Sequence, residues 1–123
     1  MIRLWMVLLG GLVFAQMALA DEAPDCKNPV DQMTMTACAG LEFEKADVEL
    51  NNVWKKLKAS IDDQDATALL KSQRAWIAYR DAQCELAGFA ARGGSLQPML
   101  VQMCLADLTL ARIKELNSVA TEE

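Results

Sequence analysis

The segment QRAWIAYRDAQC, residues 73–84, decides the fold of this 123-residue chain. On a helical wheel, one narrow arc collects the side chains that should face the interior, namely Gln73, Ile77, Arg80 and Cys84, with Leu69, Leu70 and Trp76 at its edges. The segment therefore predicts an amphipathic helix, and this helix points an amide and a guanidinium towards its own core.

Arg80 needs a partner there, because a guanidinium buried without a carboxylate is costly. A turn at residues 62–65 would fold this helix back along the preceding one and place Arg80 opposite residues 44–47. Asp47 is the expected partner and Glu44 the second candidate, since a guanidinium fork suits bidentate pairing with a carboxylate.

Neighbouring side chains extend this core ion pair into a network. Trp76 lies one turn before the arginine, where its ring can stack on the guanidinium. Gln73 is placed to satisfy Arg112 on a third helix, and Asp81 is expected to pair with Arg74 or with that third helix.

Two interpretations of Arg80 compete. In the structural one, the arginine fixes which helices pack together and in what register. In the functional one, it lies in a cleft and binds an anion. The sequence favours the structural interpretation, because every polar member of the network has an available partner and no phosphate-cradling loop lies nearby.

Apolar residues at spacings of three or four predict helices on both sides of this segment. The first is long, from about residue 31 to 61, the second runs from about 66 to 91, and the third from 95 to about 117. Short connections make neighbouring helices antiparallel. The predicted fold class is all-α, a small antiparallel three-helix arrangement with a long first helix, stapled by two disulfides.

Capping residues set the expected helix ends. Asp65 is the expected N-cap of the second helix and Ser95 that of the third, with Pro98 tolerated in its first turn. The pair Gly93-Gly94 is expected to end the second helix, because glycine adopts the left-handed conformation without strain.

The four cysteines are Cys26, Cys38, Cys84 and Cys104, and an even number in an exported protein predicts two disulfides. A hairpin that turns near residue 94 places Cys84 opposite Cys104. Cys26 and Cys38 are then left; on one continuous helix they would lie about 18 Å apart, so residues 24–30 would have to fold back along the first helix. Other pairings stay open, because all four cysteines fall towards the same end of the bundle.

Residues 1–20, MIRLWMVLLGGLVFAQMALA, have the pattern of a secretory signal peptide: a positive charge at Arg3, an apolar run and an Ala18-Leu19-Ala20 cleavage site. The expected organisation is a signal peptide, 1–20, and one helical domain, 21–123, in the periplasm or secreted. Asp21 rather than a cysteine follows the cleavage site. We therefore expect no lipid or other membrane anchor after cleavage.

Charge and composition limit the partners and the chemistry. Removal of Arg3 changes the formal net charge from −5 to −6, so we expect no nucleic acid partner and some attraction to cationic ones. The chain has no histidine, which removes the commonest general base and most zinc ligand sets. The cysteines are expected to be oxidised, so no thiolate nucleophile is available. We expect no catalytic residue, no metal and no cofactor.

Four segments carry a resemblance to a known family: CAGLEFEKADVELNNVWKKL (38–57), LKSQRAWIAYRDAQC (70–84), GGSLQPM (93–99) and CLADLTLARIKEL (104–116). In order and spacing they resemble the lysozyme inhibitor LprI-like N-terminal domain family of small exported bacterial proteins. The resemblance implies a small helical fold with paired cysteines and a shared scaffold of Cys38, Ala46, Asp47, Leu50, Asn51, Leu57, Gln73, Arg74, Trp76, Tyr79, Arg80, Asp81, Cys84, Gly94, Ser95, Cys104, Thr109, Arg112 and Leu116.

The resemblance also implies a function by binding: an exported, non-enzymatic inhibitor of a cationic lysozyme or a related cell-wall hydrolase. The family name comes from a mycobacterial lipoprotein that inhibits lysozyme. This chain has Asp21 where that protein has a lipid-anchoring cysteine, and we expect no further domain in it. The alternative is an envelope structural or interaction module that binds another ligand and does not inhibit lysozyme.

The best candidate for an inhibitory loop is the turn between the second and third helices, Arg92, Gly93, Gly94 and Ser95. Wall hydrolases often work with two carboxylates in a cleft. Arg92 could meet those carboxylates, and Ser95 could donate a hydrogen bond. The competing interpretation is that Gly-Gly-Ser only ends one helix and begins the next.

Overall fold

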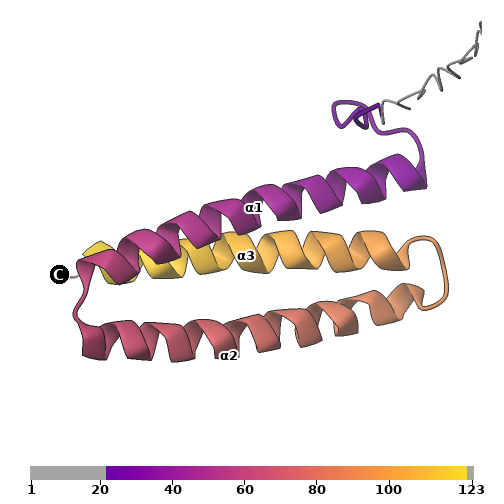
Figure 1. The fold of residues 1–123 in the computed structure, drawn as a ribbon. Helices are drawn as coiled ribbons and strands as arrows, with labels where there is room; N and C mark the ends of the chain where they lie inside the picture. The colour runs from indigo at the N-terminus through magenta and orange to yellow at the C-terminus, as the bar shows by residue number, and fades with distance from the viewer. Residues whose placement is uncertain (1–21, 122–123) are drawn as a thin grey trace, which may run out of the picture.

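The computed structural model describes residues 22–121, which form three α-helices and one short 3-10 helix (Figure 1). Helix α1 is Gln32–Ser60, α2 is Asp63–Ala87, η1 is Gly88–Ala91 and α3 is Gln97–Thr121. α1 and α3 run in the same direction and α2 in the opposite one. No strand occurs in this part of the chain, and the predicted all-α arrangement with a long first helix is confirmed. The predicted signal peptide lies outside the described residues.

Aspartates cap the first two helices. Asp31 accepts hydrogen bonds from the Thr34 amide at 2.8 Å and the Thr34 hydroxyl at 2.9 Å, which lower the pKa of its carboxyl. Asp62 caps α2 by accepting from the Asp65 amide at 2.8 Å. The prediction that Asp65 itself would be the cap is wrong by one turn, because an aspartate three residues earlier reaches its backbone N–H first.

The end of α2 differs from the prediction in its last turn. The α-helix stops at Ala87, and η1 continues to residue 91 as a tighter turn. Gly88 stands at this transition, buried against α3: a Cβ there would lie 2.9 Å from Cγ2 of Val101. Gly93 has φ +79°, the left-handed conformation that the sequence predicted for this turn.

Helix α3 begins later and ends later than predicted. Its first residue is Gln97, although the sequence predicted an N-cap at Ser95, and it continues to Thr121 rather than about 117. The Gln97 side chain bonds back to the turn, its Oε1 accepting from the Gly93 amide at 2.9 Å. The Ser95 hydroxyl makes no hydrogen bond within residues 22–121, so the predicted serine cap is wrong.

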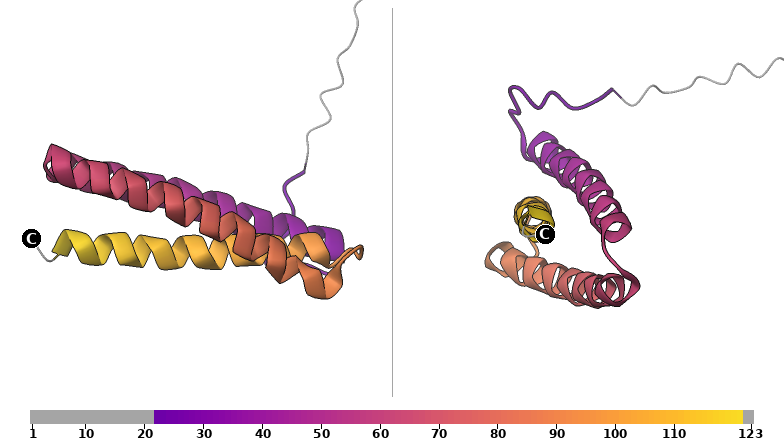
Figure 2. Two further views of the ribbon diagram at one scale, coloured as in Figure 1. Left: turned by 90° about the horizontal axis from the view of Figure 1, so that it is seen from below. Right: turned by 90° about the vertical axis from the view of Figure 1, so that its left-hand side faces the viewer.

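Helix α3 is the central packing element. It lies between α1 and α2 in Figure 1 and packs most extensively on α1, whereas α1 and α2 approach each other much less. For this reason Ile77, which the helical wheel places on the buried face of α2, remains 40 % exposed. In both views of Figure 2 the α1–α2 hairpin leans away from the C-terminal half of α3.

The core changes character along the bundle. Near the α2–α3 connection the buried residues are small, including Ala39, Gly88 and Ala106, which lets the helices approach closely. Towards the α1–α2 connection the buried cluster consists of Leu50, Leu57, Ile113 and Leu116, with Trp54 and Trp76 packed against it. We call the first region the disulfide end, because both disulfides lie there, and the second the open end. Within residues 22–121, no helix has the length and apolar character needed to span a membrane.

Candidate functional site

Two disulfides hold the disulfide end together. Cys84 and Cys104 join α2 to α3 with their Cα atoms 5.3 Å apart, and Cys26 and Cys38 join the N-terminal segment to α1 at 5.6 Å. Both predicted pairings are confirmed. Cys84 is fully buried, whereas Cys26 is exposed, so only the first bridge belongs to the packed interior.

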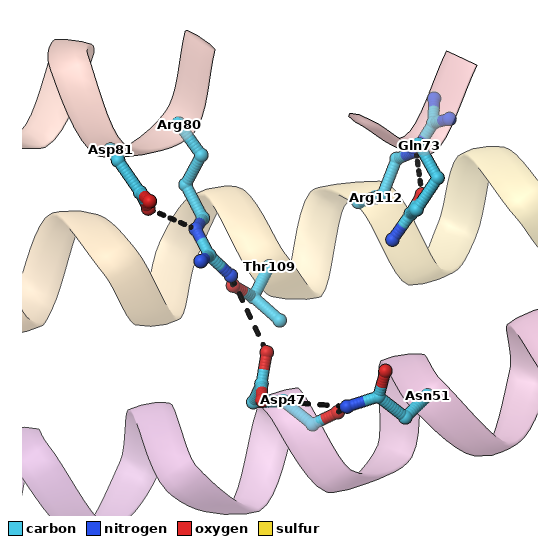
Figure 3. Close-up of polar contacts among 7 residues, drawn as sticks. All are labelled: Asp47, Asn51, Gln73, Arg80, Asp81, Thr109 and Arg112. Atoms are coloured by element: carbon cyan, nitrogen blue, oxygen red, sulfur yellow. Dashed lines mark hydrogen bonds and ion pairs between the residues drawn. The ribbon is translucent and has the colours of Figure 1, made fainter. Parts of the chain in front are cut away.

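Arg80 connects all three helices (Figure 3). Its side chain is only 10 % exposed. Nη1 lies 3.4 Å from Oδ1 of Asp47 on α1 and donates to Oγ1 of Thr109 on α3 at 3.5 Å. Nε donates to Oδ1 of Asp81 on its own helix at 2.9 Å. The guanidinium fork is therefore divided between two carboxylates, rather than bound bidentately by Asp47.

The guanidinium of Arg80 lies close to two aromatic rings. Its guanidinium carbon lies 5.1 Å from the ring centroid of Trp76 and 5.2 Å from that of Phe43. Each such cation–π contact stabilises the fold by about 0.5–1 kcal/mol at an exposed site, and by more where water is excluded. Trp76 was expected from the sequence, but Phe43 was not. The available signal was its position one turn before Asp47 on the same helix.

Arg112 forms a second, smaller junction between α2 and α3. Nε donates to Oε1 of Gln73 at 3.1 Å, Nη2 to Oγ of Ser72 at 2.7 Å, and Nη1 pairs with Oε2 of Glu115 at 2.9 Å. The structure thus brings Gln73 and Arg112 together, as Figure 3 shows. The guanidinium also lies 5.7 Å from the Trp76 ring, which therefore faces both arginines.

Two of the expected polar partners lie elsewhere. Glu44, the second candidate for Arg80, is exposed and forms none of the ion pairs within residues 22–121. Asp81 pairs with the adjacent Arg80 rather than with Arg74 or α3. Adjacent residues rarely face each other on a helix, and the long arginine side chain overcomes that separation here. This pairing could not be deduced from helical spacing.

The geometry of this Arg80 cluster favours a structural role. Two carboxylates, 42 % and 58 % exposed, already face the one guanidinium. A further anion would meet a site whose formal charge is negative. Arg80 is the point at which α1, α2 and α3 are held in register, since it contacts a side chain of each.

The candidate loop, Arg92 to Ser95, lies at the tip of the disulfide end. The Arg92 guanidinium carbon stacks 4.1 Å from the ring centroid of Phe89 in η1, and both residues are exposed. Arg92 takes part in none of the ion pairs within the described part of the chain. The guanidinium of Arg92 is therefore exposed to solvent while it stacks on the Phe89 ring.

Large apolar side chains gather around this tip. The exposed apolar residues at the disulfide end include Val30, Met33, Leu86, Phe89 and Leu96, and the first two are about 80 % exposed. A hollow of about 560 Å³ separates the start of α1 from the start of α3, and it is lined by Met33, Ala37, Ser95 and Pro98 among others. Scattered exposed apolar residues are normal, but a group around one charged tip is typical of an interaction surface.

The acidic and cysteine side chains of residues 22–121 form no metal site and include no free thiol. No group of three or more His, Cys, Asp or Glu side chains between residues 22 and 121 is placed to hold a metal ion. The cysteines there are all oxidised. What the disulfide end provides is a cross-linked, partly apolar surface from which the exposed Arg92 side chain protrudes.

Comparison with known proteins identifies the family to which the chain belongs. The family model described as lysozyme inhibitor LprI matches residues 26–116. An uncharacterized protein of Rhizobium meliloti (strain 1021) is 48 % identical over 109 residues, covering 78 % of this chain and 78 % of that protein. No solved structure matches the chain.

Proposed function

The chain belongs to the LprI lysozyme inhibitor family, and we propose that it is an exported protein that inhibits a cationic lysozyme or a related wall hydrolase through its disulfide end. The single observation that carries this proposal is the Arg92–Phe89 pair, in which a guanidinium outside the ion pairs of residues 22–121 lies 4.1 Å from the centroid of an exposed ring at the tip of the bundle. Arginine and aromatic residues are the side chains that most often dominate binding energies at protein interfaces.

The chemistry of the target suits this tip. Glycosidases of this kind cleave with two carboxyl groups in a cleft. A guanidinium that enters the cleft can pair with such a carboxylate by charge-assisted hydrogen bonds. The glycines at 93 and 94 keep the loop narrow, and the flanking apolar residues Phe89 and Leu96 can pack on the cleft walls.

Rigidity and charge support the same proposal. The Cys84–Cys104 bridge joins the two helices that flank the tip, so little conformational freedom is lost when the tip binds. The formal net charge, −5 for the full chain and −6 without Arg3, attracts a cationic target and speeds association at low ionic strength.

A lysozyme titration tests the proposal. The purified protein should slow hydrolysis of cell walls by a cationic lysozyme, and Arg92→Ala should weaken inhibition by at least about tenfold, the loss expected for a central interface residue. Arg74→Ala is the matched control, because Arg74 is an exposed arginine in the middle of α2, away from the tip. It should inhibit like the unaltered protein.

The outcomes separate the parts of the proposal. Unchanged lysozyme turnover at micromolar excess of the folded protein would contradict inhibition of that enzyme. The alternative function, an envelope module with another ligand, would then stand. Inhibition that survives both Arg92→Ala and Phe89→Ala would contradict the location of the site.

Export belongs to the proposal as well. Cleavage after Ala20 would leave a chain that begins at Asp21. Intact mass measurement of the protein recovered from the periplasm or the medium should give that N-terminus and two disulfides. Recovery only in the cytoplasm, with residues 1–20 retained, would contradict it.

A further inference from the structure

A second surface lies at the open end, opposite the tip. A groove of about 420 Å³ runs between α2 and α3 beside the end of α1, and its apolar lining consists of Leu57, Ile61, Ala68, Leu69, Leu116 and Val119. Val119 is 51 % exposed, although it continues the buried stripe of Leu116. The volume falls within the roughly 300–1,000 Å³ typical of binding pockets.

The groove exists because the helices separate there. α1 and α2 lean away from the C-terminal half of α3 (Figure 2), so the apolar faces of α2 and α3 are not fully covered by each other. A helix laid between them would complete a four-helix arrangement, which is a common way to bury such faces.

The charges around the groove indicate which kind of ligand it can bind. The carboxylates that line it belong to Asp65 and Glu115, and its one cation, Arg112, already pairs with Glu115 at 2.9 Å. Just outside the lining, exposed Asp62 and Asp63 precede Asp65 in sequence, and exposed Lys58 and Lys71 adjoin the lining residues Leu57 and Ser72, so the carboxylates of the lining itself set its acidic character. An occupant with basic side chains at its edges fits this rim, whereas a second copy of this acidic chain would meet like charge.

We propose that the open-end groove binds a basic amphipathic helix of a partner protein. Apolar side chains of that helix, spaced three or four residues apart, would cover Leu69, Leu116 and Val119. Lysine or arginine side chains at its edges would pair with Asp65 and Glu115. The proposal does not require the partner to be lysozyme, and it does not involve the Arg92 tip.

A synthetic peptide pair tests the groove directly. An amphipathic helix of leucine and lysine, about four turns long, should bind the purified protein with a micromolar Kd by isothermal titration calorimetry. A peptide of the same pattern with glutamate in place of lysine should bind at least about tenfold more weakly, because the rim is acidic.

Variants locate the binding. Ala68→Trp should fill the groove from its exposed wall and weaken binding of the lysine peptide by about tenfold or more, without touching the buried core. Ala59→Trp is the matched control, an exposed alanine at the same end of the molecule. It lies two residues from both Leu57 and Ile61, and therefore on the other side of α1. Circular dichroism should show that both variants retain the helical fold.

Three results would overturn the proposal: no binding of the lysine peptide, equal binding of both peptides, or binding that Ala68→Trp leaves unchanged. Asp65→Asn sharpens the charge argument and should weaken binding several-fold while reducing its salt dependence. Arg92→Ala should bind the peptide normally, so that failure of the lysozyme proposal and failure of this one can be told apart.

Discussion

The three helices pack differently at the two ends of this bundle. At the disulfide end, small residues such as Ala39, Gly88 and Ala106 bring the helices close, and the buried Cys84–Cys104 bridge fixes them there. At the open end, leucines and Ile113 fill the interior without a cross-link, and a groove remains. Close approach and covalent bonding give a rigid surface, whereas large side chains around a diverging hairpin leave one that can accept another helix.

The largest expected effect concerns the two disulfides. Cys84→Ala with Cys104→Ala should lower the free energy of unfolding by about 3 kcal/mol, the loop-entropy value for a bridge that closes about 20 residues. Cys26→Ala with Cys38→Ala should cost clearly less, because the segment before α1 is mostly exposed and gains freedom in the folded state as well. Urea unfolding of both double variants measures the difference. Equal losses would contradict the contrast between a buried and a peripheral bridge.

Arg80→Met tests the Arg80 cluster, which lies between the two ends, and should lower the free energy of unfolding by about 2 kcal/mol. Methionine keeps much of the buried volume but loses the ring stacking and the contacts to α1 and α3. Asp47 and Asp81 can be solvated, so no buried charge is left behind. Glu44→Gln serves as the control on α1, and thermal unfolding should place it within about 0.5 kcal/mol of the unaltered protein. A stabilising Arg80→Met would show that the cluster does not hold the helices together.

A pair of glycine substitutions compares close approach with open space. Gly88→Ala should destabilise by about 1–3 kcal/mol, because its Cβ would lie 2.9 Å from the stiff Val101 side chain. Gly40→Ala should be neutral or stabilise by up to about 1 kcal/mol, since the nearest atom is 3.8 Å away on a flexible glutamine and alanine favours the helix. Chemical denaturation measures the free energy of unfolding of both variants. The double variant Gly88→Ala with Val101→Ala should recover part of the loss, and failure to do so would point away from the clash.

The smallest effect is the pH dependence of the α1 cap. Hydrogen bonds from the Thr34 amide and hydroxyl lower the pKa of Asp31 below its usual 3.8. Because the folded-state pKa is the lower one, the ionised carboxylate stabilises the fold above the unfolded value, and this contribution disappears as the pH falls through the folded value. Asp31→Ala should therefore lower Tm at about pH 6 and much less at about pH 2. A difference in Tm that does not change with pH would contradict the role of ionisation.

Much of the α2–α3 alignment could be predicted from the sequence. The hairpin register that joins Cys84 to Cys104 also places Arg80 near residue 109 and Gln73 near Arg112, because one antiparallel alignment governs all three pairs. Asp47 followed from the register of the preceding hairpin in the same way. Register arguments work where a short connection fixes how two antiparallel helices are aligned.

The open end could not be predicted in this way. Hydrophobic spacing shows that Leu69, Leu70 and Ile77 share a face, but it does not show that α1 and α2 diverge and leave part of that face uncovered. The divergence depends on the three-dimensional sizes of residues at each level of the bundle. Local side-chain choices escaped prediction as well: Asp62 rather than Asp65 caps α2, and Arg80 pairs with its neighbour Asp81.

Amide hydrogen exchange along α2 tests the contrast between the two ends most directly. Both ends belong to one helix, so sequence-corrected protection at residues 78–85 can be compared with protection at residues 67–74 in a single experiment. The account predicts at least about tenfold greater protection at 78–85, next to the Cys84–Cys104 bridge and Arg80, and a smaller ratio after reduction of the disulfides. Equal protection along α2, or greater protection at 67–74, would contradict the division of this molecule into a rigid end and an open one.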